Sequence, residues 1–284
     1  MERGARVSGS TRLAGVIGAP IRHSLSPAIF NAAFAACGLD WVYLAFEVGP
    51  GDAGRALDAM RALDIGGLSV TMPHKDAVAH LVDQCTPEAA ALRAVNCVVS
   101  TVDGLLGENT DGPGFLDALR ADAGVDVNGR RAVVVGAGGA ARAIVLALAR
   151  AGINDVAVVN RTAERADAAA ALAGPAGRVA GIEAIGDADL VVNATSVGMG
   201  DGLMPFDPSL LVSGQVVADV VYFPSPSPLV AAAREQGITA IDGVGMLVHQ
   251  ASHAFRLWTG EEAPVAAMTE AARAGLAARR PGEV

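Results

Sequence analysis

The stretch AVVVGAGGAA, residues 132–141, constrains the fold of this chain more than any other. An apolar run ends at Gly136, and Gly138 and Ala141 complete a GxGxxA pattern. The first glycine permits a tight turn, the second lets the backbone approach a pyrophosphate, and the small third residue lets the next helix pack closely. The N-terminus of that helix then faces the anion. A strand before the pattern and a helix after it predict a dinucleotide-binding unit.

Apolar runs alternate with helical stretches along the rest of the chain. Before residue 112 we expect strands in LAGVIG, WVYLAFEV and GGLSVT, and after it in DVAVVNRT, ADLVVNATS, GQVVADVVY and TAIDG. Strands that alternate with helices predict a mainly parallel α/β sheet. The glycine-rich GENTDGPGF between the two series is expected to be a crossing loop. We therefore predict an α/β domain over 13–111, completed by C-terminal helices over 246–284, and a Rossmann-type domain over 112–245.

Composition argues against several classes of function. A net charge of −9 disfavours binding to nucleic acid or to an anionic membrane, because both need a positive surface, so a small molecule is the expected partner. Three cysteines without metal-ligand spacing (Cys37, Cys85 and Cys97) predict reduced, packed thiols in a cytoplasmic protein. No signal-peptide pattern or long apolar run is present. His249 and His253 lack the glutamate of HExxH, and we expect no metal.

The residues after the second Rossmann strand indicate the cofactor. An NAD enzyme places Asp or Glu there, against the ribose 2′-hydroxyl, whereas this chain has Asn160-Arg161-Thr162. An arginine can instead bind a 2′-phosphate with its guanidinium. We therefore expect NADP. The predicted cofactor-binding residues are Gly136, Gly138, Gly139, Ala140, Asn160, Arg161, Thr162, Arg165 and Gly243.

Lys75, in the stretch TMPHK, is the only lysine among 21 basic residues. Arginine replaces lysine wherever positive charge is enough, but its guanidinium stays protonated, while a partly buried ammonium can lose its proton. A dehydrogenase acting on alcohols and ketones needs such a proton-exchanging group beside the nicotinamide. Neither tyrosine is followed by lysine at the spacing of short-chain reductases, and a zinc cluster is missing. Lys75 is the remaining candidate.

Two serines precede a predicted helix whose first residue is Pro27. Hydroxyls at a helix N-terminus suit an anion such as a carboxylate. Ser26 could equally be a plain N-cap, whereas Ser24 has no such explanation. We take both as candidate ligands for a carboxylate.

Several motifs together resemble one enzyme family. GAPIRHSLSP, VTMPHK, AVNCV, GENTDGPGF, VVVGAGGAARA, NRT, NATSVGM, VVYFPSPSPL and GVGMLVHQ follow in the order and spacing of shikimate dehydrogenase, over about 13–258. The resemblance implies NADPH-dependent reduction of 3-dehydroshikimate to shikimate in the shikimate pathway, which leads to chorismate and the aromatic amino acids. It also implies two domains with the substrate in the cleft between them. A monomer or a homodimer is expected.

The same resemblance assigns roles to single residues. It makes Lys75 and Asp111 the catalytic pair. We expect hydride to leave C4 of NADPH while Lys75, as ammonium, hydrogen-bonds the ketone oxygen and supplies the proton, with Asp111 orienting Lys75 and a neighbouring hydroxyl. The sequence leaves open which of the two residues makes the final proton transfer. The predicted substrate-binding residues are Ser24, Ser26 and Tyr222 for the carboxylate, and Thr71, Asn96 and Gln250 for the ring hydroxyls and carbonyl.

Some positions depart from the family pattern. Ser69 replaces the asparagine of NVTxPxK, which leaves room for a relative acting on quinate or an aminoshikimate; Ser227 stands where threonine is common. Asn160-Arg161 and the intact Ser24 and Ser26 speak against the quinate enzyme. A non-catalytic NADPH-binding regulator is a further alternative, but such a protein would tolerate arginine at position 75.

Overall fold

The structure is a computed structural model that describes residues 7–279, and the chain in it divides into two compact units. Unit 1 comprises residues 7–110 and 251–279, and unit 2 comprises 111–250. The end of the predicted C-terminal segment, 280–284, lies outside the described residues. Each unit has its own sheet and its own core, which confirms the α/β class. None of the helices within 7–279 is both long and apolar enough to cross a bilayer.

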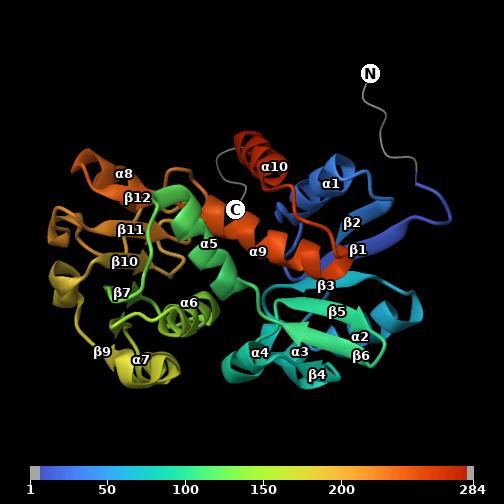
Figure 1. Ribbon diagram of the computed structural model, residues 1–284, viewed down its shortest axis with the longest axis horizontal. Coiled ribbons are helices and arrows are strands. Elements are labelled where there is room, and N and C mark those ends of the chain that lie inside the picture. Colours follow the sequence, from blue (N-terminus) through green and yellow to red (C-terminus); the bar gives the residue numbers. More distant parts are fainter. Residues whose placement is uncertain (1–6, 280–284) are drawn as a thin grey trace. The chain divides into compact units, whose positions relative to one another are not determined.

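The sheet of unit 1 has the order β2-β1-β3-β5-β6-β4. β1 runs parallel to β2 and β3, whereas β5 runs antiparallel to β3 and β6. The strands, shown in Figure 1, are β1 (Arg12–Gly18), β2 (Trp41–Glu47), β3 (Gly67–Val70), β4 (Gln84–Cys85), β5 (Cys97–Thr101) and β6 (Gly104–Glu108).

The hairpin of β5 and β6 is missing from the sequence prediction of a mainly parallel sheet. Only Val102 and Asp103 join the two strands, and a connection this short permits an antiparallel pair alone. Gly104 follows with φ of 113°, a conformation that favours glycine. The Asp103-Gly104 pair between apolar runs is the sequence signal that would have indicated a hairpin.

Helices cover both faces of this sheet. Leu68 and Val70 of β3 share a core with Leu57, Met60 and Val78 on one face. The helices of unit 1 are α1 (Ser26–Ala36), α2 (Ala53–Ala62), α3 (Lys75–Leu81), α4 (Pro87–Leu92), the last turns of α9 (Gly243–Thr259) and α10 (Val265–Ala277).

An aromatic cluster lies against the other face. Tyr43 of β2 stacks on Phe30 of α1, with ring centroids 4.4 Å apart and planes 4° from parallel. Trp258 of α9 packs on both rings, and its indole N–H donates to the carbonyl oxygen of Val98. These contacts fix α1, and with it the serines at its start, against the sheet.

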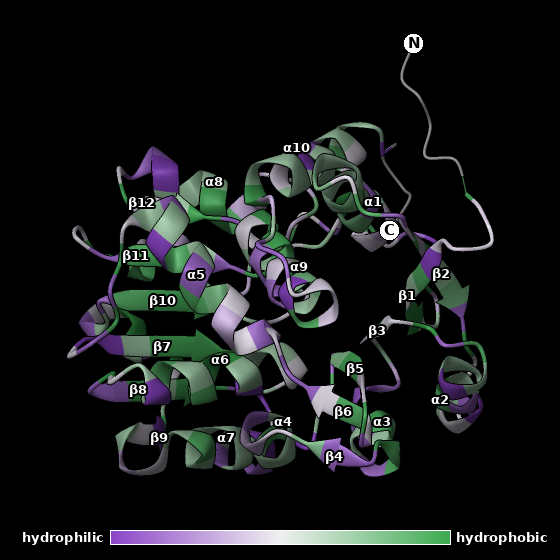
Figure 2. Ribbon diagram, turned by 45° about the vertical axis from the view of Figure 1, so that its right-hand side comes forward, coloured by the Kyte–Doolittle hydropathy of each residue, from purple (hydrophilic) through white to green (hydrophobic). Residues whose placement is uncertain are grey.

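Unit 2 contains a six-stranded sheet in which every pair is parallel, with the order β12-β11-β10-β7-β8-β9. Counted from its first strand this is 3-2-1-4-5-6 in reverse, the Rossmann order, so the predicted fold is confirmed. Figure 2 shows that the central strands β7 and β10 are mostly hydrophobic, and their polar residues, Arg131 and Asn193, lie at strand ends. The strands are β7 (Arg131–Val135), β8 (Asp155–Val159), β9 (Gly177–Val179), β10 (Leu190–Asn193), β11 (Val216–Asp219) and β12 (Thr239–Ile241).

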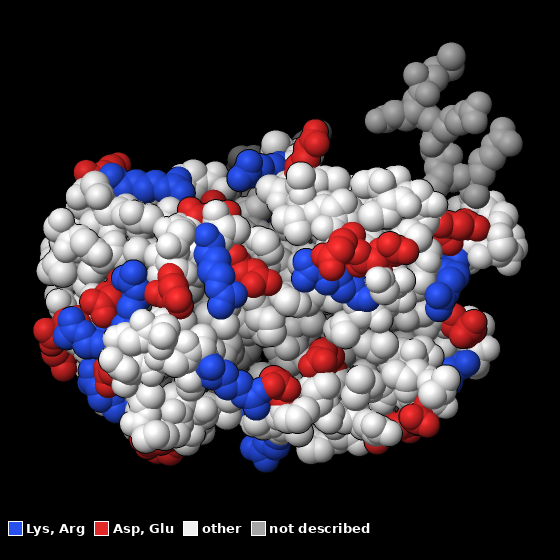
Figure 3. Space-filling view, in the orientation of Figure 1, with Lys and Arg blue, Asp and Glu red and all other residues white. Residues whose placement is uncertain are grey.

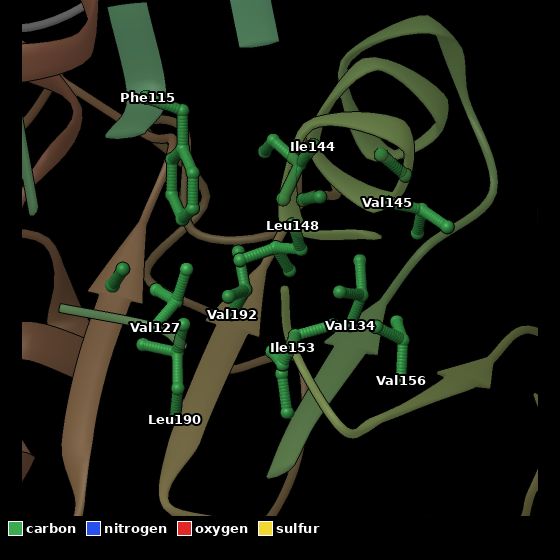
Figure 4. Close-up of a cluster of buried hydrophobic side chains, with 14 of the residues drawn as sticks. Phe115, Val127, Val134, Ile144, Val145, Leu148, Ile153, Val156, Leu190 and Val192 are labelled. Atoms are coloured by element: carbon green, nitrogen blue, oxygen red, sulfur yellow. The ribbon is translucent and has the colours of Figure 1, made fainter. Parts of the chain in front are cut away.

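The helices of unit 2 pack their apolar residues on this sheet. In Figure 4, Phe115 of α5 and Ile144 and Leu148 of α6 point toward Val134 and Val192 of the strands. The helices are α5 (Asp111–Ala123), α6 (Gly139–Arg150), α7 (Ala163–Ala170), α8 (Pro228–Glu235) and the first turns of α9, with short 3-10 helices at Ala171–Ala176, Ile182–Asp187 and Pro208–Leu210.

The segment DGPG, predicted to be part of a crossing loop, is helical. α5 begins at Asp111, and its first turn contains Pro113, which a helix start tolerates. Both glycines of the segment allow close packing. A Cβ at Gly112 would lie 2.9 Å from the carbonyl oxygen of Ala143, and one at Gly114 would lie 2.5 Å from the backbone nitrogen of Gln250. The glycines therefore serve helix contacts that the sequence alone did not reveal.

Candidate active site

The candidate residues of unit 1 lie around the carboxyl ends of its parallel strands. Ser24 and Ser26 follow β1, and Thr71 directly follows β3. The amide of Ala19 donates to the carbonyl oxygen of Met72 at 3.0 Å, which joins the two connecting segments. Open α/β sheets bind their ligands at this end of the strands.

Lys75 is the first residue of α3 and is partly buried. The preceding His74 is buried, with its Nε2 2.8 Å from the carbonyl oxygen of Val48. The amide of Val95 donates to the carbonyl oxygen of Lys75 at 2.9 Å. The backbone that carries the only lysine is therefore held on both sides.

Asn96 lies at the same edge, just before β5. Its carbonyl oxygen accepts from the amide of Val70 at 2.7 Å, one residue before Thr71. Its buried side chain accepts from the amide of Thr110 at 2.8 Å and donates to the Thr110 hydroxyl at 3.0 Å. Unit 1 thus brings Thr71, Lys75 and Asn96 into one neighbourhood.

The start of α1 differs from the prediction by one residue. The helix begins at Ser26, not at Pro27, and Leu25 is its N-cap residue without a side-chain cap. The interpretation of Ser26 as a plain N-cap is therefore wrong. Ser24 takes part in local capping instead, since its Oγ accepts from the Ser26 amide at 3.2 Å.

Ser69 has a partner that the sequence did not reveal. The fully buried phenol of Tyr43 donates to the Ser69 hydroxyl at 2.7 Å. Burial raises the pKa of Tyr43 strongly. The hydrogen bond with Ser69 lowers it, the nearby Cys97 raises it and the interaction with Ser26 lowers it, so the rise is opposed only in part and the phenol stays protonated. The chain has two tyrosines, and nothing in the sequence spacing indicated that Tyr43 lies beside Ser69.

The GxGxxA turn of unit 2 fits a dinucleotide. Gly136 has φ of 115°, and a Cβ there would lie 2.8 Å from the carbonyl oxygen of Ala194. A Cβ built at Gly138 or Gly139 meets no atom within 4 Å, which leaves space for a pyrophosphate. No side chain caps α6, whose N-cap is Gly138, so its first amides remain available for an anion.

The predicted NADP selector lies next to this turn. The amide of Gly136 donates to the carbonyl oxygen of Val159, the last residue of β8, and Asn160 follows. Asn160 donates from its side chain to the carbonyl oxygen of Thr162 at 3.0 Å. Arg161 is exposed, as is Arg165 in the first turn of α7. Two exposed guanidinium groups at this place suit a 2′-phosphate.

Asp111 and Gln250 both belong to unit 2. Asp111 is buried at the first position of α5. The close approach of Gly114 to Gln250 places the first turn of α5 beside the part of α9 that carries Gln250. The side chain of Gln250 donates to the carbonyl oxygen of Leu247.

Tyr222 lies on the segment that follows β11, and Gly243 is the first residue of α9, shortly after the carboxyl end of β12. A Cβ at Gly243 would lie 2.1 Å from the carbonyl oxygen of Val220, and the Gly243 amide donates to Val221. The glycine is therefore required where α9 approaches the Tyr222 segment. Three polar residues at the same edge are buried, namely Asn193, Asp219 and Ser227. The sequence analysis noted Ser227 only as a departure from the family pattern and singled out neither of the other two.

The surface and the cysteines add to the chemical description. On the face shown in Figure 3, basic residues are interspersed with acidic ones and form no continuous patch among the described residues. Within 7–279 no three His, Cys, Asp or Glu side chains form a possible metal site.

Cys37, Cys85 and Cys97 are free thiols. Cys97 is buried, as expected, but Cys37 is exposed because it lies at the C-terminal end of α1, which corrects the prediction of packing for all three.

Three family models match the chain. Residues 16–98 match the shikimate dehydrogenase substrate binding domain, 119–198 match shikimate / quinate 5-dehydrogenase, and 243–273 match the shikimate 5′-dehydrogenase C-terminal domain.

Known proteins agree with these matches. A shikimate dehydrogenase (NADP(+)) of Moorella thermoacetica is 45% identical over 98% of both chains. The crystal structure of shikimate 5-dehydrogenase from Thermus thermophilus with NADP(H) and shikimate has a TM-score of 0.88 and 38% identity, covering 93% of this chain and all of that one. Quinate dehydrogenase from Corynebacterium glutamicum with NAD has a TM-score of 0.85 and 35% identity, covering 93% and 99%.

Proposed function

The chain belongs to the shikimate dehydrogenase family, and on that basis we propose that it reduces 3-dehydroshikimate to shikimate with NADPH. In this role it is an oxidoreductase of the shikimate pathway, which supplies aromatic amino acid biosynthesis. We further propose that unit 2 binds the cofactor and that unit 1 provides most of the substrate site, to which Tyr222 and Gln250 of unit 2 also contribute.

The position of the chain's only lysine is the observation that carries this proposal. Lys75 lies beside Thr71 and Asn96 at the carboxyl ends of parallel strands, on a backbone held by Val95 and His74. A group that gives up a proton to a ketone oxygen has to be able to lose it, which lysine can do and arginine cannot.

The remaining residues supply binding and orientation. We assign the carboxylate of the substrate to Ser24, Ser26 and Tyr222, because hydroxyl groups donate well to a carboxylate. Thr71, Asn96 and Gln250 are assigned to the ring hydroxyls and carbonyl. Their side chains provide both donors and acceptors.

The proton and the hydride reach the ketone from different sources. When bound, NADPH supplies the hydride that adds to the carbonyl carbon. The ammonium of Lys75 hydrogen-bonds the carbonyl oxygen and transfers its proton to it as negative charge develops there, leaving a neutral amine that solvent reprotonates. Asp111 orients the ammonium. On the cofactor, the guanidinium of Arg161 binds the 2′-phosphate, and the glycine turn accommodates the pyrophosphate.

The test is to measure initial rates with shikimate and with quinate, each with NADP and with NAD. We expect turnover confined to shikimate with NADP. Turnover with quinate or with NAD would instead favour a quinate/shikimate or aminoshikimate enzyme of the same family. Cofactor binding without any turnover would favour a regulator and refute the enzymatic proposal.

For the protein in the cell we propose a monomer or a homodimer in the cytoplasm. Three free thiols suit a reducing compartment. Sedimentation equilibrium measures the oligomeric state directly, and a higher oligomer would contradict the proposal.

A further inference from the structure

A buried carboxylate ends β11 at the cofactor edge of unit 2. Asp219 is 3% exposed and accepts three hydrogen bonds. Asn193 Nδ2 donates to Oδ1 at 2.8 Å, the Val221 amide donates to Oδ1 at 3.0 Å, and Ser227 Oγ donates to Oδ2 at 2.6 Å. The last distance is typical of a hydroxyl bonded to an ionised carboxylate.

The directions of these bonds are fixed by the surroundings. Oδ1 of Asn193 accepts from the amide and the hydroxyl of Thr195, at 3.1 and 2.7 Å, so its Nδ2 has to face Asp219. Oγ of Ser227 accepts from the amide of Val230 at 3.3 Å and gives its one proton to Asp219. The carboxylate therefore meets three donors.

One carboxylate thereby organises two segments. Val221 and Ser227 bracket Tyr222, so the segment that carries the tyrosine is tied to Asp219 at both ends. Through Asn193 the same network reaches Thr195. The neighbouring Ala194 donates from its amide to the carbonyl oxygen of Val135, the residue before Gly136.

The surroundings of Asp219 make its ionised form less stable than that of an exposed aspartate. Burial raises its pKa, and the negative charge of Asp242 adds to this, while the hydrogen bonds from Ser227, Val221 and Asn193 oppose the rise without cancelling it. Asp242, between β12 and α9, is bonded to the Ser225 hydroxyl at 2.5 Å. Protonation would give the carboxyl group an O–H donor of its own where three donors already face it. Because a donor cannot accept at that position, at least one of the three hydrogen bonds would be lost.

We propose that Asp219 is a positioning residue, whose ionised carboxylate holds the Tyr222 segment and the Asn193 turn in the conformation that binds substrate and cofactor. This inference rests on the proposed function, in which Tyr222 contacts the substrate. Activity is then lost on the acid side as Asp219 takes up a proton, at a pH above the ordinary range of an aspartate.

The test compares the acid limb of kcat/KM for shikimate in three variants. Asp219→Asn keeps the shape but cannot titrate, so the limb disappears and KM for shikimate at neutral pH rises about tenfold, the loss expected from one charged hydrogen bond. Ser227→Ala removes one donor to the ionised form, so the limb moves to higher pH. Ser225→Ala is the matched control, because its hydroxyl faces Asp242, and its limb stays in place.

A merely structural role would lower the melting temperature of Asp219→Asn and Ser227→Ala without moving the limb. An unchanged limb in both variants overturns the inference while leaving the proposed function intact. If Asp219→Asn fails to fold, the shift in Ser227→Ala decides.

If the wild type does not turn over shikimate, the proposed function fails, and hydrogen exchange of the amides of 220–227 then serves as the readout. The quantity compared is the protection factor, that is, the exchange rate corrected for its intrinsic dependence on pH. Protection that falls on acidification, with the fall shifted to higher pH in Ser227→Ala, supports the proposed role of Asp219. Protection factors that do not change with pH overturn it.

Discussion

At the scale of single residues, the role of Lys75 can be tested with two variants, one that removes both its positive charge and its transferable proton and one that keeps the charge alone. We expect Lys75→Met to lower kcat by about 10²–10⁴-fold, the usual contribution of a positioned acid or base. Lys75→Arg keeps the positive charge but does not titrate, so kcat falls by a similar factor while KM for shikimate changes less. Steady-state kinetics of both variants measure this. Near-normal turnover of either variant would contradict the role of Lys75 as proton donor.

The hydroxyl of Tyr43 determines how the Ser69 side chain is oriented. Its bond to Ser69 joins β2 to β3, and its ring lies on Phe30 of α1. Ser69, which replaces the asparagine of the family pattern, therefore accepts a hydrogen bond from Tyr43 at its hydroxyl oxygen. This gives Ser69 a defined polarity, because its own proton has to point away from Tyr43.

At the scale of elements, close packing of α5 depends on glycine. In an ordinary helix, alanine in place of glycine stabilises by about 1 kcal/mol. At Gly114 the added Cβ would lie 2.5 Å from the backbone nitrogen of Gln250, which cannot rotate away. We expect Gly114→Ala to lower the free energy of unfolding by about 1–3 kcal/mol, because overpacking outweighs propensity, and to raise KM for shikimate by displacing Gln250.

Urea unfolding and steady-state kinetics measure these two effects. The matched control is Gly186→Ala, where a new Cβ meets no atom within 4 Å; we expect a change in unfolding free energy within about 0.5 kcal/mol. A stable, fully active Gly114→Ala protein would show that α5 moves aside easily.

At the scale of the whole molecule, ligand binding shows which unit holds the cofactor. A ligand at about 100 times its dissociation constant stabilises the folded protein by about 2.7 kcal/mol. We expect NADPH to raise the melting temperature more than NADH does at equal concentration. Arg161→Ala should remove most of that difference by weakening NADPH binding about 10–100-fold, the loss of a charged hydrogen bond.

Arg120→Ala is the control, an exposed arginine of unit 2 on α5 that pairs with Asp117. Its melting temperatures with the two cofactors should match those of the wild type. Equal weakening of NADPH and NADH by Arg161→Ala would refute its role as selector.

The sequence by itself determined the Rossmann unit and predicted a role for Lys75, because the GxGxxA turn and a single lysine among arginines are local signals. It also indicated NADP, through Asn160-Arg161. Only the tertiary structure placed Asp219 against Asn193, 26 residues away, and Tyr43 against Ser69, also 26 residues away. The tertiary structure likewise decided that DGPG is helical, because Gly112 packs closely against Ala143 and Gly114 against Gln250, both far along the chain. Such contacts depend on packing between elements, which local propensity does not encode.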